Sequence, residues 1–163
     1  MIEPFETLAT NSNILMAEDN DDDAFLMCRA FRKARLLNPL VRVRTGEEAI
    51  AYLQGDGRYG NRTRYPLPFL LLLDLKMPRM NGFEVLKWVR EQEKLKGLLV
   101  VVLTSSTREP DINQAYDLGA NSFLSKPAHF DDLVQLLKRL QGYWLITNVA
   151  PDIRQPHQME LVQ

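Results

Sequence analysis

The chain has 163 residues, of which 45% are apolar and 25% charged, and its formal net charge is −1. This length fits one domain with its own core. The near-neutral charge argues against general binding to nucleic acid. The single cysteine, Cys28, excludes an intrachain disulfide and suits a reducing, cytoplasmic location. The longest apolar runs, residues 67–73 and 98–103, are far shorter than the roughly 20 residues that cross a bilayer, so we expect no membrane association.

The first two predicted strands differ in how much of each is buried. Residues 14–17 form a short apolar run, and the amphipathic stretch after it can be capped by Asp21 or Asp22. Residues 40–44 alternate apolar and basic side chains, a pattern typical of a half-exposed edge strand. The first helix is predicted from apolar positions that recur at helical spacing, namely Ala24, Met27, Cys28, Phe31 and Ala34.

The second helix is followed by an unusually long connection. Thr45 and Glu48 are spaced as a capping box for a helix that runs through Leu53. Residues 55–68 are rich in Gly, Pro, Arg and Tyr, and they exceed the usual length of a connection between a helix and a strand. We expect a surface insertion here, either ordered or mobile, whose cations and aromatic rings would suit recognition of a partner.

The rest of the chain completes a repeating pattern. Residues 69–73 and 99–103 are continuous apolar runs, as expected for strands covered on both faces. A helix-like stretch follows each of them, and a fifth strand at residues 122–125 precedes a helix from Phe130 to Trp144. Five βα repeats predict an α/β fold with a parallel sheet, a flavodoxin-like, doubly wound three-layer sandwich in which the strand order is 2-1-3-4-5. The predicted organisation is an N-terminal tail (1–12), one domain (13–147) and a C-terminal tail (148–163).

Polar side chains follow four of these strands. Glu18 and Asp19 come after the first strand, Asp74 follows the third, Thr104 ends the fourth, and Lys126 follows the fifth. Sites in open parallel sheets lie beyond the carboxyl ends of the strands, where the strand order reverses. Three clustered carboxylates repel one another unless a cation is present, and an all-oxygen ligand set favours Mg²⁺. Mg²⁺, Lys126 and Thr104 could together hold a phosphoryl group, with Asp74 as the attacking carboxylate.

This constellation resembles the receiver domain of two-component response regulators. The resemblance covers about residues 13–147 and rests on four separated motifs in the family's order. These are the acidic pair Glu18-Asp19, the phosphoacceptor loop from Leu73 to Gly82, the switch position Thr104-Ser105, and the Ser125-Lys126-Pro127 signature.

The resemblance implies a signalling protein that is not an enzyme, beyond intrinsic autodephosphorylation at most. Asp74 would accept a phosphoryl group from the phosphohistidine of a partner sensor histidine kinase, and Lys126 would contact that group. Mg²⁺ would be bound by Asp19, Asp74 and the backbone carbonyl of Lys76, with Glu18 helping directly or through water.

The resemblance also implies a conformational switch. Thr104 would move toward the phosphoryl group and Phe123 would turn inward, although Phe123 also suits a simple core position. The Lys126-Pro127 peptide bond would be cis.

A narrower resemblance is to the single-domain regulators that partner cyanobacterial phytochrome histidine kinases. It rests on the long insertion, on the absence of a further domain after the receiver in this sequence, and on Tyr143-Trp144-Leu145 near the end of the last helix. Extra apolar positions on that helix predict a homodimer formed by the fourth helix, fifth strand and fifth helix. The residues expected at this interface are Leu136, Tyr143, Trp144 and Ile146.

Other functions fit the sequence less well. The main alternative is an Mg²⁺-dependent phosphohydrolase with an aspartyl nucleophile, but such enzymes often carry a second acid two residues after the nucleophile, where this chain has Lys76. A dinucleotide site is disfavoured because the turn after the first strand is acidic rather than glycine-rich. No sequence resembling a DNA-binding domain follows residue 147, so the downstream partner is expected to be a protein.

The remaining charged residues have simpler interpretations. We interpret Asp21, Asp22 and Asp23 as a solvated helix N-terminus. The basic residues of positions 24–64 are either a solvated face or a docking surface.

Overall fold

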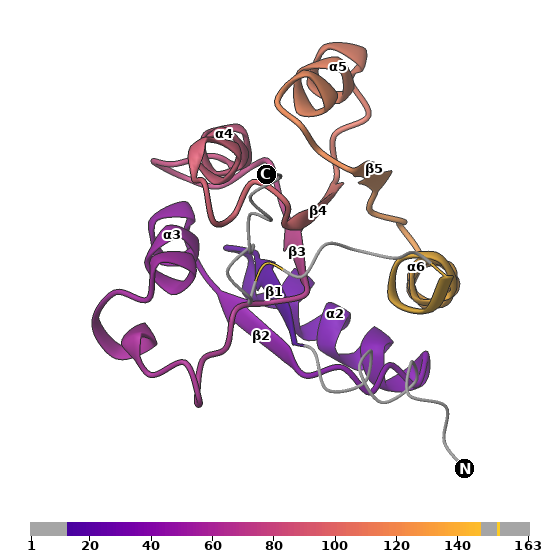
Figure 1. Ribbon diagram of the computed structural model, residues 1–163. Helices are drawn as coiled ribbons and strands as arrows, with labels where there is room; N and C mark the ends of the chain where they lie inside the picture. Colours follow the sequence, from indigo (N-terminus) through magenta and orange to yellow (C-terminus); the bar gives the residue numbers. More distant parts are fainter. Residues whose placement is uncertain (1–12, 148–152, 154–163) are drawn as a thin grey trace, which may run out of the picture.

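The computed structural model describes residues 13–147 and residue 153 (Figure 1). Five parallel strands form one sheet in the order β2-β1-β3-β4-β5, which confirms the predicted fold class and strand order. The predicted tails at 1–12 and 148–163, apart from residue 153, lie outside the described residues. The strands are β1 (Ile14–Ala17), β2 (Leu40–Val43), β3 (Leu70–Leu73), β4 (Leu99–Thr104) and β5 (Ser122–Ser125).

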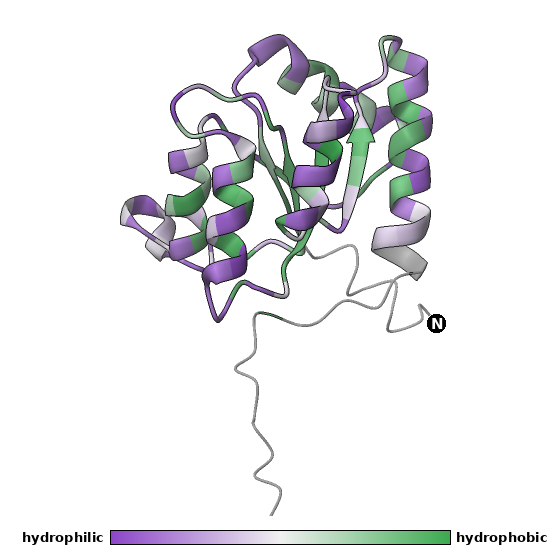
Figure 2. Ribbon diagram, turned by 90° about the horizontal axis from the view of Figure 1, so that it is seen from above, coloured by the Kyte–Doolittle hydropathy of each residue, from purple (hydrophilic) through white to green (hydrophobic). Residues whose placement is uncertain are grey.

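Helices cover both faces of the sheet. In Figure 1, α3, α4 and α5 lie on one side and α2 and α6 on the other, and Figure 2 shows apolar residues on the helix faces that meet the strands. None of the helices within the described residues is long and apolar enough to cross a membrane. The helical segments are α2 (Asp21–Lys33), α3 (Gly46–Gln54), the 3₁₀ turn η1 (Gly57–Gly60), α4 (Gly82–Glu91), α5 (Glu109–Asp117), α6 (Phe130–Leu140) and the π-helical segment η2 (Gln141–Thr147).

The strand burial follows the apolar patterns of the sequence. β3 and β4 are buried along their whole length, as continuous apolar runs predict, and each contributes side chains to the cores on both sides of the sheet. β2 lies at the edge and pairs only with β1, with Leu40 opposite Ile14, and most of its side chains are half-buried. The alternation of apolar and basic residues in this strand therefore matches its position.

Two predicted helix caps are corrected by the structure. The side chain of Asn20, rather than Asp21 or Asp22, caps α2 by accepting a hydrogen bond from the Asp23 amide at 2.9 Å. Asn20 has extended backbone and precedes the helix, as an N-cap must, whereas the aspartates already lie in its first turn. Thr45 does cap α3, but Glu48 accepts from the Arg44 amide instead of the Thr45 amide, so only half of the capping box forms.

The insertion at residues 55–68 is bound closely to α3. Arg62 donates hydrogen bonds to the carbonyls of Tyr52 at 2.7 Å and Leu53 at 2.8 Å, in the last turn of α3, where carbonyls lack the amide partner four residues further on. The rings of Tyr52, Tyr59 and Tyr65 pack against one another with centroids 4.9 to 6.1 Å apart. Of the two alternatives for this segment, the structure shows an ordered insertion.

Candidate functional site

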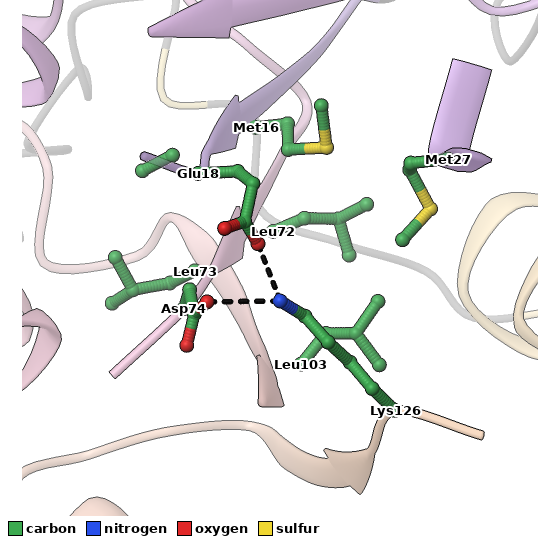
Figure 3. Close-up of a pocket in the computed structure, with 9 residues that line it drawn as sticks. Met16, Glu18, Met27, Leu72, Leu73, Asp74, Leu103 and Lys126 are labelled. Atoms are coloured by element: carbon green, nitrogen blue, oxygen red, sulfur yellow. Dashed lines mark hydrogen bonds and ion pairs between the residues drawn. The ribbon is translucent and has the colours of Figure 1, made fainter. Parts of the chain in front are cut away.

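Three of the side chains predicted to form the site, Glu18, Asp74 and Lys126, meet at the carboxyl edge of the sheet (Figure 3). The amide of Asp74 donates to the carbonyl of Ala17 at 3.2 Å, and the amide of Lys126 donates to the carbonyl of Thr104 at 2.8 Å. These bonds continue the strand pairing by one residue, so each polar side chain is fixed just beyond its strand. Glu18, Asp74 and Lys126 line one small pocket whose floor is apolar and includes Met27 from α2.

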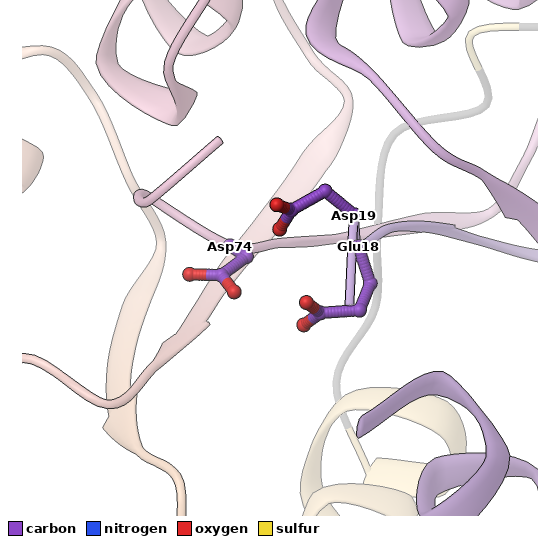
Figure 4. Close-up of side chains that lie close together, drawn as sticks. All are labelled: Glu18, Asp19 and Asp74. Atoms are coloured by element: carbon purple, nitrogen blue, oxygen red, sulfur yellow. The ribbon is translucent and has the colours of Figure 1, made fainter. Parts of the chain in front are cut away.

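Three carboxylates form the candidate metal centre (Figure 4). Glu18, Asp19 and Asp74 each offer an oxygen within 4.8 Å of the others. Glu18 and Asp74 are buried, whereas Asp19 is exposed at the mouth of the site. An all-oxygen set that is open on one side suits a hard divalent cation that keeps part of its water shell. The residues present therefore fit Mg²⁺, and the Lys76 carbonyl stays a predicted ligand.

Lys126 joins the carboxylates with a positive charge. Its ammonium lies 2.5 Å from Glu18 Oε2, 2.9 Å from Asp74 Oδ2 and 3.1 Å from Asp23 Oδ2. A lysine has three N–H donors, so all three can be used here. Burial disfavours the ammonium, but hydrogen bonds to Glu18 and Asp74 keep the pKa of Lys126 above its usual range.

Asp23 has a role that its sequence pattern does not indicate. The acidic run from Asp21 to Asp23 predicts a solvated helix N-terminus, yet Asp23 contacts Lys126 across the site. A signal was present, because Asp23 precedes Met27 by four residues and positions i and i+4 share one helix face. Since Met27 lines the pocket, Asp23 lies on the side of α2 that faces the site.

Asp21 has a different role from Asp23. Its Oδ1 accepts from both Arg42 and Arg44 at 2.7 Å, and Arg42 also donates to the Glu18 carbonyl at 2.9 Å. The hydrogen bond from Arg42 and the charge of Arg44 hold the pKa of Asp21 below its usual value. The two arginines on the β2 side therefore engage this acid at the rim, and they are not simply a solvated basic face.

Both carboxylate oxygens of Asp74 accept hydrogen bonds. Oδ2 faces Lys126, while Oδ1 accepts from the Thr104 hydroxyl at 2.9 Å and from the Lys76 amide at 3.1 Å. Burial opposes ionisation, but the hydrogen bond and charge of Lys126 outweigh it, so the pKa of Asp74 lies below its usual range. Asp74 is thus an oriented, ionised carboxylate at neutral pH.

Glu18 titrates differently from Asp74. Burial, together with the nearby Asp74 charge, raises the pKa of Glu18 to about 7 even though Lys126 opposes the shift. Two buried carboxylates that share one ammonium cannot both ionise freely, and Glu18 is the one that holds a proton more readily. A divalent cation would supply the missing positive charge.

The predicted switch residues have clear positions. Thr104 is fully buried against Asp74. Phe123 is half-buried and packs against the core on the α3–α5 side, and its amide donates to the Tyr116 hydroxyl at 3.1 Å. The expected cis bond between Lys126 and Pro127 is wrong, because no peptide bond among the described residues is cis. Even before proline the trans form is favoured by about 0.5–1 kcal/mol.

The residues predicted at the dimer interface differ in their exposure. Leu136 and Trp144 are half-buried and pack against the core between α2, α6 and the sheet. Tyr143 is 56% exposed, and its ring meets that of Trp144 edge-on with centroids 5.0 Å apart. The side chain of Ile146 lies outside what the structure describes.

Comparisons of the sequence and of the structure with known proteins both support the resemblance to receiver domains. The model of the response regulator receiver domain matches residues 14–138. A probable methanogenesis regulatory protein, FilR2 of Methanothrix harundinacea, is 38% identical over 141 residues, which is 85% of this chain and 86% of that protein. The response regulator Rcp1 of Synechocystis is 36% identical over 138 residues, or 85% of this chain and 92% of that protein.

Solved structures of response regulators superpose on this chain. The phosphorylated cyanobacterial phytochrome response regulator RcpA superposes with a TM-score of 0.80 at 38% identity, covering 86% of this chain and 99% of that one. The Mn²⁺-bound form of Rcp1 superposes with a TM-score of 0.77 at 35% identity, covering 86% and 99%. With these matches and an acidic centre placed after β1 and β3, the chain belongs to the response regulator receiver domain family and is related to the phytochrome response regulators.

Proposed function

We propose that this protein is a response regulator that accepts a phosphoryl group on Asp74 from a histidine kinase and signals by contact with another protein. The observation that carries the proposal is the placement of the Asp74 carboxylate between the Thr104 hydroxyl and the Lys126 ammonium, beside two further acids. The match to the receiver family supports the predicted cytoplasmic location.

The chain's own residues supply most of the chemistry. An oxygen of Asp74 forms a bond to phosphorus while the bond between phosphorus and the kinase histidine nitrogen breaks, and the imidazole leaves with the electron pair. Lys126 and Thr104 are placed to donate hydrogen bonds to the transferred oxygens. Mg²⁺, bound by Asp19, Asp74 and the Lys76 carbonyl with help from Glu18, would neutralise charge on those oxygens.

A phytochrome is the kinase that we propose as partner. The support is the relationship to RcpA, which is a cyanobacterial phytochrome response regulator, over nearly the whole of that chain. The phosphohydrolase alternative is weaker, because the exposed Lys76 stands where a second acid would be needed and the family is generally one of signalling proteins.

The direct test is phosphorylation by a small donor. Incubation of the protein with Mg²⁺ and acetyl phosphate should add the mass of one phosphoryl group, and chelation of the metal should prevent the gain. Mass spectrometry of the intact protein reads the result. A protein that gains no mass with Mg²⁺ present would contradict the proposal, and steady turnover of phosphomonoesters would favour the phosphohydrolase.

Mg²⁺ affinity is expected to depend on pH through Glu18. Because the pKa of Glu18 is about 7, this group is protonated below that pH and the cation must displace its proton. The affinity should therefore fall as the pH drops below 7, by up to about tenfold per pH unit, and change little from this group above it. Calorimetric titration at about pH 6 and about pH 8 measures the difference. Glu18→Gln should remove most of the dependence, and an equal affinity of the wild-type protein at both pH values would contradict it.

We also propose a homodimer through the α5–β5–α6 face. Tyr116 on α5 and Tyr143 after α6 are both about half exposed, which suits an isologous contact. Tyr143→Glu should halve the mass that light scattering measures, because a charge would be buried at the interface. Leu37→Glu, a matched change at an exposed leucine between α2 and β2, should leave the mass unchanged. A Tyr143→Glu variant with the wild-type mass would contradict this interface.

A further inference from the structure

Lys126 is shared between the metal centre and a carboxylate outside it. Glu18 and Asp74 belong to the three-carboxylate cluster, whereas Asp23 does not and contacts the ammonium from the first turn of α2. The Lys126 side chain is only 15% exposed, but that of Asp23 is 46% exposed. Asp23 is thus the partner of Lys126 that can keep its ion pair when Glu18 and Asp74 bind a cation.

Metal entry changes what the ammonium can contact. A cation at the cluster competes with Lys126 for the oxygens of Glu18 and Asp74, which now lie 2.5 and 2.9 Å from the ammonium. A buried ammonium that loses its acceptors costs free energy, and this cost weakens metal binding. A third acceptor that is not a metal ligand lowers the cost.

We propose that Asp23 is a positioning residue that holds the Lys126 ammonium from the α2 side, so that Lys126 can release Glu18 to a divalent cation and still remain beside Asp74. Its own position is fixed, since the Asp23 amide donates to the Asn20 side chain at 2.9 Å at the start of α2. This inference rests on the proposed Mg²⁺ site and adds a residue that acts on that site only through Lys126.

Calorimetric titration with Mg²⁺ at neutral pH tests the proposal on the full chain. Asp23→Asn should weaken Mg²⁺ binding by about three- to fivefold, the range expected for a half-exposed ion pair, and Asp23→Glu should restore part of the loss. Asp22→Asn is the matched control, because it removes the same charge from the same helix turn at an exposed position. It should leave the affinity nearly unchanged.

A second comparison separates positioning from the simple effect of charge. In a Lys126→Gln background, Asp23→Asn should have no further effect, because the group that it positions is gone. If Asp23→Asn weakened Mg²⁺ binding equally in that background, or if Asp22→Asn weakened it as much as Asp23→Asn does, long-range charge would explain the effect and the proposal would be overturned. An Asp23→Asn variant with wild-type Mg²⁺ affinity would also overturn it. If the wild-type protein binds no Mg²⁺, the metal site itself fails and this inference falls with it. Circular dichroism checks that each variant is folded.

Discussion

Asp74→Asn is expected to gain no phosphoryl mass under conditions in which the wild-type protein gains one group. The amide has nearly the shape of the carboxylate, so the contact with the Thr104 hydroxyl can persist. However, it lacks the negative charge and the nucleophilic oxygen pair that attack phosphorus. The loss should be complete rather than partial, because among the acids of the site (Glu18, Asp19, Asp23 and Asp74) only Asp74 lies between the Thr104 hydroxyl and the Lys126 ammonium. Intact-mass spectrometry after incubation with Mg²⁺ and acetyl phosphate measures it.

Asp22→Asn is the matched control for this experiment. It removes one carboxylate from an exposed position four residues after Glu18 and should be phosphorylated like the wild-type protein. If Asp74→Asn gained mass as fast as the control, the acceptor would be another residue. The position of Asp74 after β3 would then have to be explained as structural.

The sheet and the main site could be predicted because they depend on patterns along the chain. Continuous apolar runs at β3 and β4 indicate strands that are covered on both faces, and both strands are buried throughout. Once the strand order is known, residues that directly follow neighbouring strands must meet at one edge. Asp19, Asp74 and Lys126 were found in this way.

Contacts between side chains of distant elements could not be predicted. The acids from Glu18 to Asp23 look alike in sequence, but Asp21 binds the arginines beside β2 whereas Asp23 binds Lys126. Which acid faces which cation depends on the rotation of α2 about its axis, and that rotation follows from the packing of its apolar face, with Met27 and Phe31, against the sheet.

The apolar surplus of α6 has a similar explanation. Leu136 lies beside the main apolar stripe on a helical wheel, yet it packs against a core that α2 and α6 share. A helix that contacts both a sheet and a neighbouring helix buries a wider stripe than one that contacts a sheet alone. Excess apolar positions on such a helix are therefore weaker support for a dimer than they appear in the sequence.

Gly82→Ala is expected to lower both the stability and the phosphorylation rate. Gly82 is the first residue of α4. Its amide donates to the carbonyl of Leu75, the residue that follows the phosphoacceptor Asp74, at 3.0 Å. An added Cβ would lie 2.4 Å from the Asp74 carbonyl oxygen and 2.8 Å from the Leu75 Cα. Both are backbone atoms, so the loop that carries Asp74 must shift. We expect a loss of about 1–3 kcal/mol in the free energy of unfolding, as for overpacked cores, measured by urea denaturation.

The same shift should slow phosphorylation by about tenfold or more, because small displacements of a reacting group carry large rate penalties. Gly142→Ala is the control, since among the described residues a Cβ there would meet no atom within 4 Å outside its chain neighbours and the local helix backbone, and it should change the stability by less than about 0.5 kcal/mol. A Gly82→Ala variant that is destabilised but phosphorylated at the wild-type rate would show that the loop adapts without moving the acceptor. A reduced rate in a folded variant would instead show that the glycine sets the position of Asp74, because the substitution changes no group that can touch the phosphoryl donor.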